Sequence, residues 1–323
     1  MGILVITPGI QTLIQDAGRP GYAQLGVARS GAFDLVAWRR ANRIAGNDLP
    51  KPQSEEAGPA ALEVLIGGLE FITTADVTLA VSGAELTVAA TSPTGESREL
   101  VRDTSHRIES GVTVTLSRAT NGLRAYVAFQ GGLDSPQVLG SRSYDTTAQL
   151  GPLPAVGGLE LSIATHDPTE ASELATRNAS NALNEPSETQ LEPPVAGRHP
   201  EEQPTSSYFE LTPGPEVYLL HTKPESLTAV TWKISPSSSR AGIRLTPVSE
   251  QTPIASAASL PSAPALPGAI QAFPNGELVA LGPDGPTTGG YPVLAIMSRH
   301  DLSRLSQIRP GTHVTLTQSS PAQ

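Results

Sequence analysis

The sequence predicts a mainly β protein with a few short helices. Thirty glycines and thirty prolines in 323 residues, with aromatic side chains at 4%, favour many turns and few long helices. Short β-branched segments that alternate between apolar and polar residues point to the same fold class. The length is sufficient for two domains, each with its own hydrophobic core.

Six segments of the first half have the pattern expected of strands. They are rich in β-branched residues, roughly alternating, and separated by turns that contain Gly or Asp. They cover residues 2–7, 62–66, 77–82, 86–90, 112–117 and 123–129. A second set of strands is expected from Tyr208 onward.

One helix is predicted over residues 33–45, because its apolar residues recur at helical spacing. Ser30 or Asp34 is suited to cap its start, and Gly46 is suited to end it. A second, shorter helix is expected over about residues 299–307.

The composition changes over residues 166–207, which are rich in Glu, Asn, Pro, Ser and Thr and poor in large apolar residues. This composition predicts a flexible linker or insertion. It divides the chain into an N-terminal domain, residues 1–165, and a C-terminal domain, residues 208–323. Smaller insertions are expected at residues 49–60 and 250–267.

The two halves share a short similarity. Residues 6–9 read Ile-Thr-Pro-Gly and residues 211–214 read Leu-Thr-Pro-Gly, each a predicted strand that runs into a Pro-Gly turn. Two related β-barrel domains, which can exchange strands, would explain the similarity. Chance in a Pro-rich chain is the alternative.

Charge and composition exclude several kinds of site. The net charge of −10 disfavours nucleic-acid binding, and the absence of cysteine excludes disulfides, zinc–thiolate sites and cysteine nucleophiles. The six histidines have no metal-ligand spacing, and no apolar run approaches the roughly 20 residues that span a bilayer. Residues 1–7 lack the pattern of a secretory signal. We therefore expect a cytoplasmic protein with no metal site and no nucleic-acid or membrane partner.

The first polar cluster contains Asp16 and Arg19, within residues 16–21 (Asp-Ala-Gly-Arg-Pro-Gly). A tight turn there places a carboxylate beside a guanidinium that is suited to bind a carboxylate or phosphate. An ion pair that only holds the turn is an equal alternative. Residues 27–34 follow and lead into the predicted helix, where backbone N–H groups either bind an anion or are simply capped.

The second cluster is Ser141, Arg142 and Ser143, next to Gly140. Two hydroxyls and a guanidinium on one loop suit the recognition of a carbonyl or an oxyanion. Alternatively, Arg142 is a buried structural anchor. No Ser-His-Asp arrangement and no Gly-x-Ser-x-Gly elbow accompanies these serines.

The third cluster is Arg240 and Arg244, which are four residues apart. On an extended strand they would point to the same side, because side chains alternate with period two. Such a pair indicates an acidic substrate or partner surface. A solvated strand face is the alternative.

The fourth cluster lies in residues 284–292 and contains Asp284, Thr287, Thr288 and Tyr291 around two glycines. The glycines permit close backbone approach, and the carboxylate and hydroxyls are suited to orient a small polar ligand. The segment is not a Walker loop, so we do not expect this chain to bind ATP unaided.

These motifs together resemble the family called biotin-dependent carboxyltransferase or allophanate hydrolase subunit 2. The resemblance covers the chain outside the predicted insertions. It rests on residues 8–12, 16–19, 26–34, 41–47, 62–63, 140–143, 242–245, 284–292 and 301–302.

The resemblance implies tandem cyclophilin-like β-barrels and a complex with other proteins. The implied function is that of the C subunit of an ATP-dependent 5-oxoprolinase, an amidohydrolase that converts 5-oxoproline to glutamate. The implied partners are a smaller protein of related fold (the B subunit of 5-oxoprolinase, or allophanate hydrolase subunit 1 type) and a third protein, the A subunit. The chain is then inactive alone, ATP is used by the complex, and no biotin is attached to this chain.

Two alternatives follow from the same family. The chain is then an allophanate hydrolase subunit 2 or urea-type carboxyltransferase component, or a non-catalytic partner of a kinase-inhibitor-like protein. Ser239 and Tyr144 stand where the family usually has Asp and Thr, which keeps the regulatory alternative open.

The resemblance also implies a shared site. By similarity, this site lies near Arg19, Arg142, Arg240, Arg244, Thr287, Thr288 and Tyr291. With the polar clusters described above, the candidate catalytic residues of the site are Asp16, Arg19, Arg142 and Asp284. Its candidate substrate-binding residues are Ser141, Ser143, Arg240, Arg244, Thr287, Thr288 and Tyr291.

Overall fold

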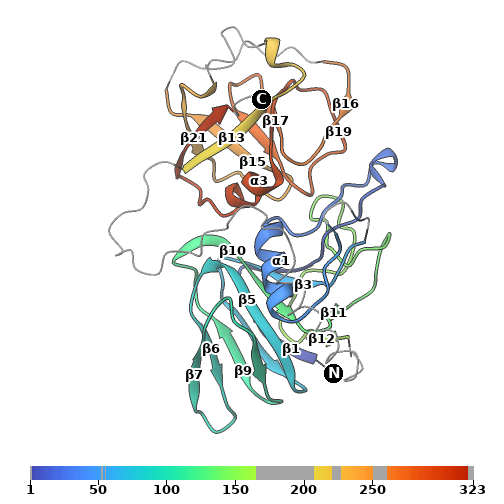
Figure 1. The fold of residues 1–323 in the computed structure, drawn as a ribbon, viewed down its shortest axis with the longest axis vertical. Helices are drawn as coiled ribbons and strands as arrows, with labels where there is room; N and C mark the ends of the chain where they lie inside the picture. The colour runs from blue at the N-terminus through green and yellow to red at the C-terminus, as the bar shows by residue number, and fades with distance from the viewer. Residues whose placement is uncertain are drawn as a thin grey trace, which may run out of the picture.

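The computed structural model describes residues 2–51, 54, 56–164, 207–219, 227–249 and 260–318. The two halves of the chain form two β units that lie one above the other along the long axis (Figure 1). The mainly β prediction is confirmed. The predicted linker lies outside the described residues, apart from Ser207, which begins a strand of the second unit.

The N-terminal unit contains two sheets. The seven-stranded sheet has the order β11-β12-β1-β4-β9-β6-β7, with β1 Gly2–Pro8, β4 Leu69–Thr73, β6 Val88–Thr91, β7 Ser97–Leu100, β9 Thr113–Leu116, β11 Leu133–Asp134 and β12 Glu160–Ile163. The five-stranded sheet has the order β2-β3-β10-β5-β8, with β2 Gln11–Gln15, β3 Ala61–Leu65, β5 Val77–Glu85, β8 His106–Ile108 and β10 Asn121–Phe129. Each of the six segments predicted as strands overlaps a strand of these sheets.

The main core of this unit lies between the two sheets. Phe71 of β4 and Phe129 of β10 are fully buried and meet edge to face, with ring centroids 5.8 Å apart and an interplanar angle of 70°. Val5 and Leu62, from opposite sheets, belong to the same buried cluster. Alternating apolar residues on each strand therefore supply one shared core.

Helix α1, Leu35–Ile44, packs on the five-stranded sheet (Figure 1). Trp38 and Ala41 are fully buried against small and aromatic residues of that sheet, including Tyr126 and Ala128. The helix begins at Asp34, whose Oδ1 accepts a hydrogen bond of 2.9 Å from the backbone N–H of Ala37. Of the two predicted capping residues, the structure therefore uses Asp34.

The C-terminal unit is a closed barrel. Its order is β13-β20-β17-β18-β15-β14-β21, with β13 Ser207–Pro213, β14 Thr231–Ile234, β15 Gly242–Pro247, β17 Ala269–Ala272, β18 Leu278–Leu281, β20 Val293–Met297 and β21 His313–Gln318. The parallel pairing of β13 with β21 closes it. A short ribbon, β16 Ala263–Pro264 with β19 Thr288–Gly289, and helix α3, Arg299–Leu305, complete the unit. Two 3-10 turns, η1 Ala23–Leu25 and η2 Val217–Leu219, lie in the N-terminal and C-terminal units.

The two units share a core contact at Phe33. This residue precedes α1, yet its buried ring belongs to the hydrophobic cluster of the barrel, with Leu302 and Leu305 of α3. Gly282, just after β18, leaves the space for the ring, because a Cβ there would lie 2.9 Å from Phe33 Cζ. The N-terminal segment therefore completes the core of the C-terminal barrel.

Within the described part of the chain, no helix has the length and apolar character required to cross a membrane.

Candidate functional site at the junction of the two units

A buried ionic network joins the two units. Arg240, just before β15, forms a two-point ion pair with Asp284 through Nε–Oδ2 and Nη2–Oδ1 distances of 2.8 and 3.0 Å. Its Nη1 lies 2.6 Å from Oε1 of Glu63 on β3. The exposed fractions of these three side chains are 4% or less. Paired geometry of this kind offsets part of the desolvation cost of buried charges.

Glu63 extends the network into the five-stranded sheet. Its Oε2 accepts hydrogen bonds from the Phe33 backbone N–H (2.9 Å) and from the Tyr126 hydroxyl (2.6 Å). The guanidinium groups of Arg124 and Arg240 lie 4.6 and 5.9 Å from the centre of the Phe33 ring. The position of Phe33 is therefore held by a backbone hydrogen bond, by apolar contacts and by two neighbouring guanidinium groups.

Asp284 receives donors from both units. Ser30 Oγ donates to Oδ1 at 2.9 Å, while the backbone N–H and Oγ1 of Thr146 donate to Oδ2 at 2.9 and 2.7 Å. Burial alone would raise the pKa of Asp284, but the charge and hydrogen bonds of Arg240, together with Thr146, hold it below its ordinary value. Burial disfavours the charge of Arg240, but Asp284 and Glu63 outweigh it and raise the pKa of the guanidinium. The pair is therefore held ionised.

A second buried cluster surrounds Asp16. Its Oδ1 accepts hydrogen bonds from Ser141 Oγ (2.7 Å), Ser143 Oγ (2.5 Å) and the Gly18 N–H, and its Oδ2 accepts one from the Arg142 N–H (2.6 Å). Burial raises the pKa of Asp16, and these hydrogen bonds oppose that rise.

Arg19, 1% exposed, ties the same two loops together. Its side chain donates to the backbone oxygens of Val138 and Ser143. Burial lowers the pKa of Arg19, while the charge of Asp16 opposes the change. The Asp16 turn and the serine loop are thus one hydrogen-bonded unit.

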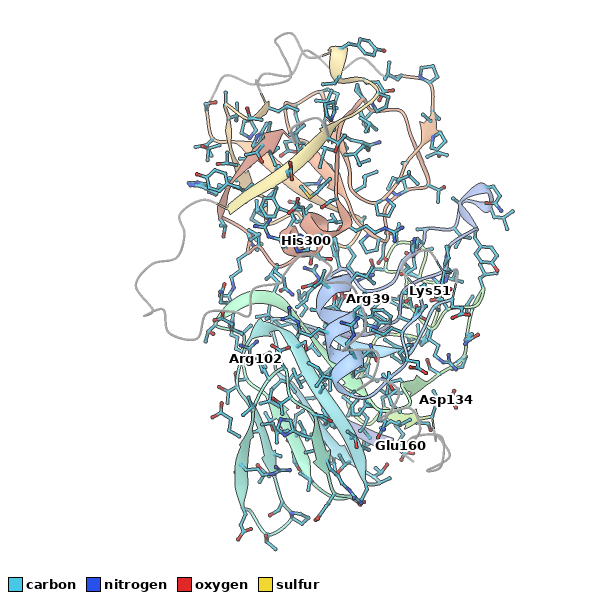
Figure 2. The ribbon with its side chains drawn as sticks, viewed as in Figure 1. Arg39, Lys51, Arg102, Asp134, Glu160 and His300 are labelled. Atoms are coloured by element: carbon cyan, nitrogen blue, oxygen red, sulfur yellow. The ribbon has the colours of Figure 1, made fainter. Side chains whose placement is uncertain are left out.

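Arg142 and Arg244 direct their side chains to other partners. Arg142 Nη2 lies 3.4 Å from Asp134 Oδ1, and Figure 2 shows Asp134 in the N-terminal unit, away from the barrel. Arg244 Nη1 lies 3.4 Å from Glu277 Oε2, and its guanidinium lies 5.5 Å from the centre of the Phe273 ring.

The expected common direction of Arg240 and Arg244 is wrong. β15 begins at Gly242, and the backbone groups of Ser239 and Gly242 bond to each other across a turn. Arg240 lies in this turn, so the alternation of a strand does not apply to it. Arg240 enters the buried junction, whereas Arg244 is half-exposed on the barrel.

A cleft of about 460 Å³ lies beside the ionic network and takes its walls from both units. The walls are mostly apolar residues, glycines and prolines from residues 17–35, 265–267, 281–287 and 296–303. The polar side chains among the lining residues are Arg29, Ser30, Thr287, Arg299 and Ser303. Figure 2 shows His300, which follows Arg299, on the side of the barrel that faces the N-terminal unit.

Arg29 is positioned by its own loop. Its Nε donates to the Ala17 backbone oxygen at 3.4 Å. Burial, together with the charge of Arg299, lowers the pKa of Arg29. Arg29 and Arg299 both line the cleft, one from each unit.

The predicted site residues divide into four groups. Six form the buried clusters: Asp16, Arg19, Ser141, Ser143, Arg240 and Asp284. Thr287 lines the cleft, and the side chains of Arg142 and Arg244 pair elsewhere. Thr288 is exposed in β19, and Tyr291, 39% exposed, stacks on Phe273 with ring centroids 4.2 Å apart.

Sequence reasoning missed Arg29 and Arg299 as site residues. Both lie within segments that the sequence marks, since Arg29 directly precedes Ser30-Gly31 and Arg299 begins the second predicted helix. Their meeting in one cleft depends on the packing of α3 against the N-terminal unit, which no local pattern shows.

Comparison with known sequences gives one family and two kinds of relative. Residues 25–318 match the model of the family "Carboxyltransferase domain, subdomain A and B". The chain is 29% identical to the C subunit of 5-oxoprolinase from Escherichia coli (strain K12) over 320 residues, which cover 98% of this chain and 91% of that protein. It is also 29% identical to urea amidolyase of Lachancea kluyveri, covering 96% of this chain and 16% of that protein.

Solved structures share the fold. The chain superposes on TTHA0988 with a TM-score of 0.76 and 26% identity, over 98% of this chain and 56% of that one. It superposes on K. lactis urea amidolyase with a TM-score of 0.74 and 24% identity, over 99% and 19% of the two chains. This chain thus spans about half of TTHA0988 and about a fifth of that urea amidolyase. With the family match covering most of its length, the chain belongs to the family of carboxyltransferase domains formed by subdomains A and B.

Proposed function

We propose that this chain is the C subunit of an ATP-dependent 5-oxoprolinase complex. The observation that carries the proposal is the extent of the similarity: the alignment covers 98% of this chain and 91% of the Escherichia coli protein. A second relative of the same name, from Haemophilus influenzae, aligns over 93% of this chain and 86% of its own length. In the urea amidolyases the matched region is a small part of a much longer chain.

The reaction of such a complex is the opening of the 5-oxoproline ring to glutamate, coupled to ATP hydrolysis. Negative charge develops on the amide oxygen as the carbonyl is attacked, and preorganised cations and N–H or O–H donors stabilise such charge. The cleft offers Arg29, Arg299 and the Thr287 hydroxyl for contact with a small substrate. We assign ATP binding to the other two proteins of the complex, because this chain has no Gly-Lys-Ser/Thr phosphate loop.

We assign positioning roles to the buried clusters. Asp16 and Asp284 are each fully buried and accept several hydrogen bonds, so neither carboxylate is available to substrate in this arrangement. Asp284 holds the loop that carries Ser30 against the barrel, and Asp16 holds its own turn against the loop of Ser141 and Ser143.

A second candidate function is the transfer of a carboxyl group from carboxybiotin on another protein. The identity to urea amidolyases and the family model support it. Under this proposal a biotinylated protein is the partner.

Reconstitution separates the two candidates. The chain is combined with the other two proteins of the 5-oxoprolinase complex, and 5-oxoproline-dependent ATP hydrolysis and glutamate release are measured together. Activity that requires all three chains supports the first proposal. Turnover that is absent with 5-oxoproline but present with urea or allophanate, or with a biotinylated partner, overturns it in favour of the second. Tight partner binding without any turnover favours a regulatory role.

A further inference from the structure

Ser303 of α3 lies in the wall of the cleft with an unpaired hydroxyl. The residue is 2% exposed and is one of the residues that line the cleft. Among the residues that the structure describes, none forms a hydrogen bond with its Oγ. Buried hydroxyls in proteins normally have a partner, so an unpaired one in the wall of a cleft indicates a ligand.

Helix α3 does not use the Ser303 hydroxyl, although it uses the hydroxyls of the serines at its two ends. Ser298 precedes the helix, and its Oγ accepts a hydrogen bond of 3.0 Å from the Asp301 N–H. Ser306 follows the helix, and its Oγ donates to the Ser303 backbone oxygen at 2.7 Å. A serine within a helix commonly bonds a carbonyl of the preceding turn in this way. The Ser303 hydroxyl therefore has no part in capping or bracing the helix.

The other hydroxyls of the cleft differ between the two units. Ser30, from the N-terminal unit, donates to Asp284 Oδ1 at 2.9 Å and to the Tyr144 backbone oxygen at 3.2 Å. Thr287, from the barrel, resembles Ser303, because its Oγ1 forms no hydrogen bond with the described residues. The barrel wall therefore carries two hydroxyls that remain available to a ligand.

The surroundings of Ser303 restrict the group that it can bind. The walls of the cleft are mostly apolar residues, glycines and prolines, and the volume of about 460 Å³ falls in the range of roughly 300–1,000 Å³ that is usual for small-molecule sites. A single hydroxyl does not offset the desolvation of an ionised ligand group, but it satisfies a neutral carbonyl by one hydrogen bond. The position of Ser303 thus suits the carbonyl of a small amide.

We propose that the Ser303 hydroxyl donates a hydrogen bond to the lactam carbonyl of 5-oxoproline bound in the cleft. The choice of 5-oxoproline rests on the function proposed above, whereas the choice of a carbonyl rests on the hydroxyl and its apolar surroundings. Ser303 is then a substrate-binding residue, which orients the ring and takes no part in bond making or breaking.

Thermal unfolding of the full chain tests whether the hydroxyl is unpaired. Ser303→Ala should leave the Tm unchanged or raise it, because alanine favours the helix and no hydrogen bond within the protein is lost. Ser306→Ala is the comparison from the same helix end, and it should lower the Tm because its hydroxyl is bonded. A loss of Tm in Ser303→Ala as large as that in Ser306→Ala would show that the Ser303 hydroxyl serves the fold, which overturns the proposal.

Calorimetric titration tests the binding role, with the full chain and with the assembled complex. The ligands are 5-oxoproline and cyclopentanecarboxylate, which has a five-membered ring and a carboxylate but no lactam. Ser303→Ala should weaken the binding of 5-oxoproline by about three- to tenfold and leave the binding of cyclopentanecarboxylate unchanged. Ser105→Ala is the matched control, because Ser105 is exposed and does not line the cleft.

Three binding results would also overturn the role of Ser303: undiminished affinity of Ser303→Ala for 5-oxoproline, an equal loss of affinity for both ligands, or no binding of 5-oxoproline to chain or complex. Kinetics of the complex separate this proposal from the proposed function. A Ser303→Ala complex that turns over 5-oxoproline with an unchanged KM removes the role of Ser303 and keeps the function. Binding of 5-oxoproline that depends on Ser303, without turnover in any complex, keeps the role of Ser303 and removes the function.

Discussion

Arg240 of the barrel and Glu63 of the N-terminal sheet form an ion pair of 2.6 Å, and both side chains are 4% exposed. The pair connects residues that are 177 positions apart in the chain. Because neither charge reaches solvent, Glu63 depends on Arg240, and Arg240 depends on Glu63 and Asp284, for stability in the interior.

Replacement of Arg240 by Ala should lower the free energy of unfolding by about 3–5 kcal/mol, because Glu63 and Asp284 then remain as buried charges without their partner. Urea unfolding measures the change. Arg244→Ala is the control, since Arg244 is 39% exposed and its pair with Glu277 should contribute no more than about 1 kcal/mol. Equal losses in the two variants would show that the buried network does not stabilise the junction.

Replacement of Gly282 by Ala should destabilise the protein by about 1–3 kcal/mol or more. A Cβ at this position would lie 2.1 Å from the Arg240 backbone oxygen and 2.9 Å from Phe33 Cζ. Gly95→Ala is the control: Gly95 has a positive φ, of 90°, but a Cβ there meets nothing within 4 Å. Thermal unfolding measures the loss of Tm in each variant: Gly282→Ala reports a steric clash, and Gly95→Ala reports backbone strain alone. A smaller loss of Tm for Gly282→Ala than for Gly95→Ala would contradict the packing described.

The stability of the protein should depend on the side-chain amide of Gln307. Its Oε1 accepts from the N–H groups of Leu123 and Arg124, each at 2.8 Å, and its Nε2 donates to Asp34 Oδ2 at 2.7 Å. Gln307→Ala leaves these groups without their partner, which costs about 1–3 kcal/mol if they stay buried. Gln307→Glu keeps the acceptor but places a carboxylate against Asp34, so we expect it to be at least as destabilising at neutral pH and milder at about pH 4, near the ordinary pKa of Glu. A Glu variant as stable as the wild type at neutral pH would contradict these hydrogen-bond assignments.

Asp284 should make the free energy of unfolding depend on pH in the acidic range. Its pKa is below the ordinary value of 3.8 in the folded chain, so its contribution is present above pH 3.8 and is lost as the pH falls through the folded pKa. Asp284→Asn should therefore destabilise the protein more at about pH 6 than at about pH 3, by unfolding measurements at both values. Asp16→Asn is the comparison, because the pKa of Asp16 is raised and its ionisation opposes folding as the pH rises. A penalty for Asp284→Asn that grows towards low pH would contradict the assigned sign.

Local patterns were sufficient for the fold class and for the helices. The apolar spacing that predicted a helix at residues 33–45 corresponds to α1, and Asp34 supplies the cap. Strands β2 and β8 escaped prediction. The three residues of β8 carry too little alternation to distinguish them from a turn.

The polar clusters predicted from the sequence contact one another in the fold, and their spacing along the chain does not predict these contacts. Asp16 contacts Ser141 and Ser143 across more than a hundred residues, and Asp284 contacts Ser30 across 254. The sequence identified the residue types suited to ionic contacts. It did not show whether each charge faces a ligand or another protein charge, because burial is decided by tertiary packing.

The insertion of Phe33 into the barrel core has a consequence for recombination between relatives. A barrel fragment expressed from residue 207 onward lacks the ring that fills the space beside Gly282, so it should be recovered in folded form only when the N-terminal half is supplied, in cis or in trans. For the same reason, a chimaera should inherit the residues at positions 33 and 282 from one parent. The two units must then be exchanged together, although they follow each other along the chain as separate segments.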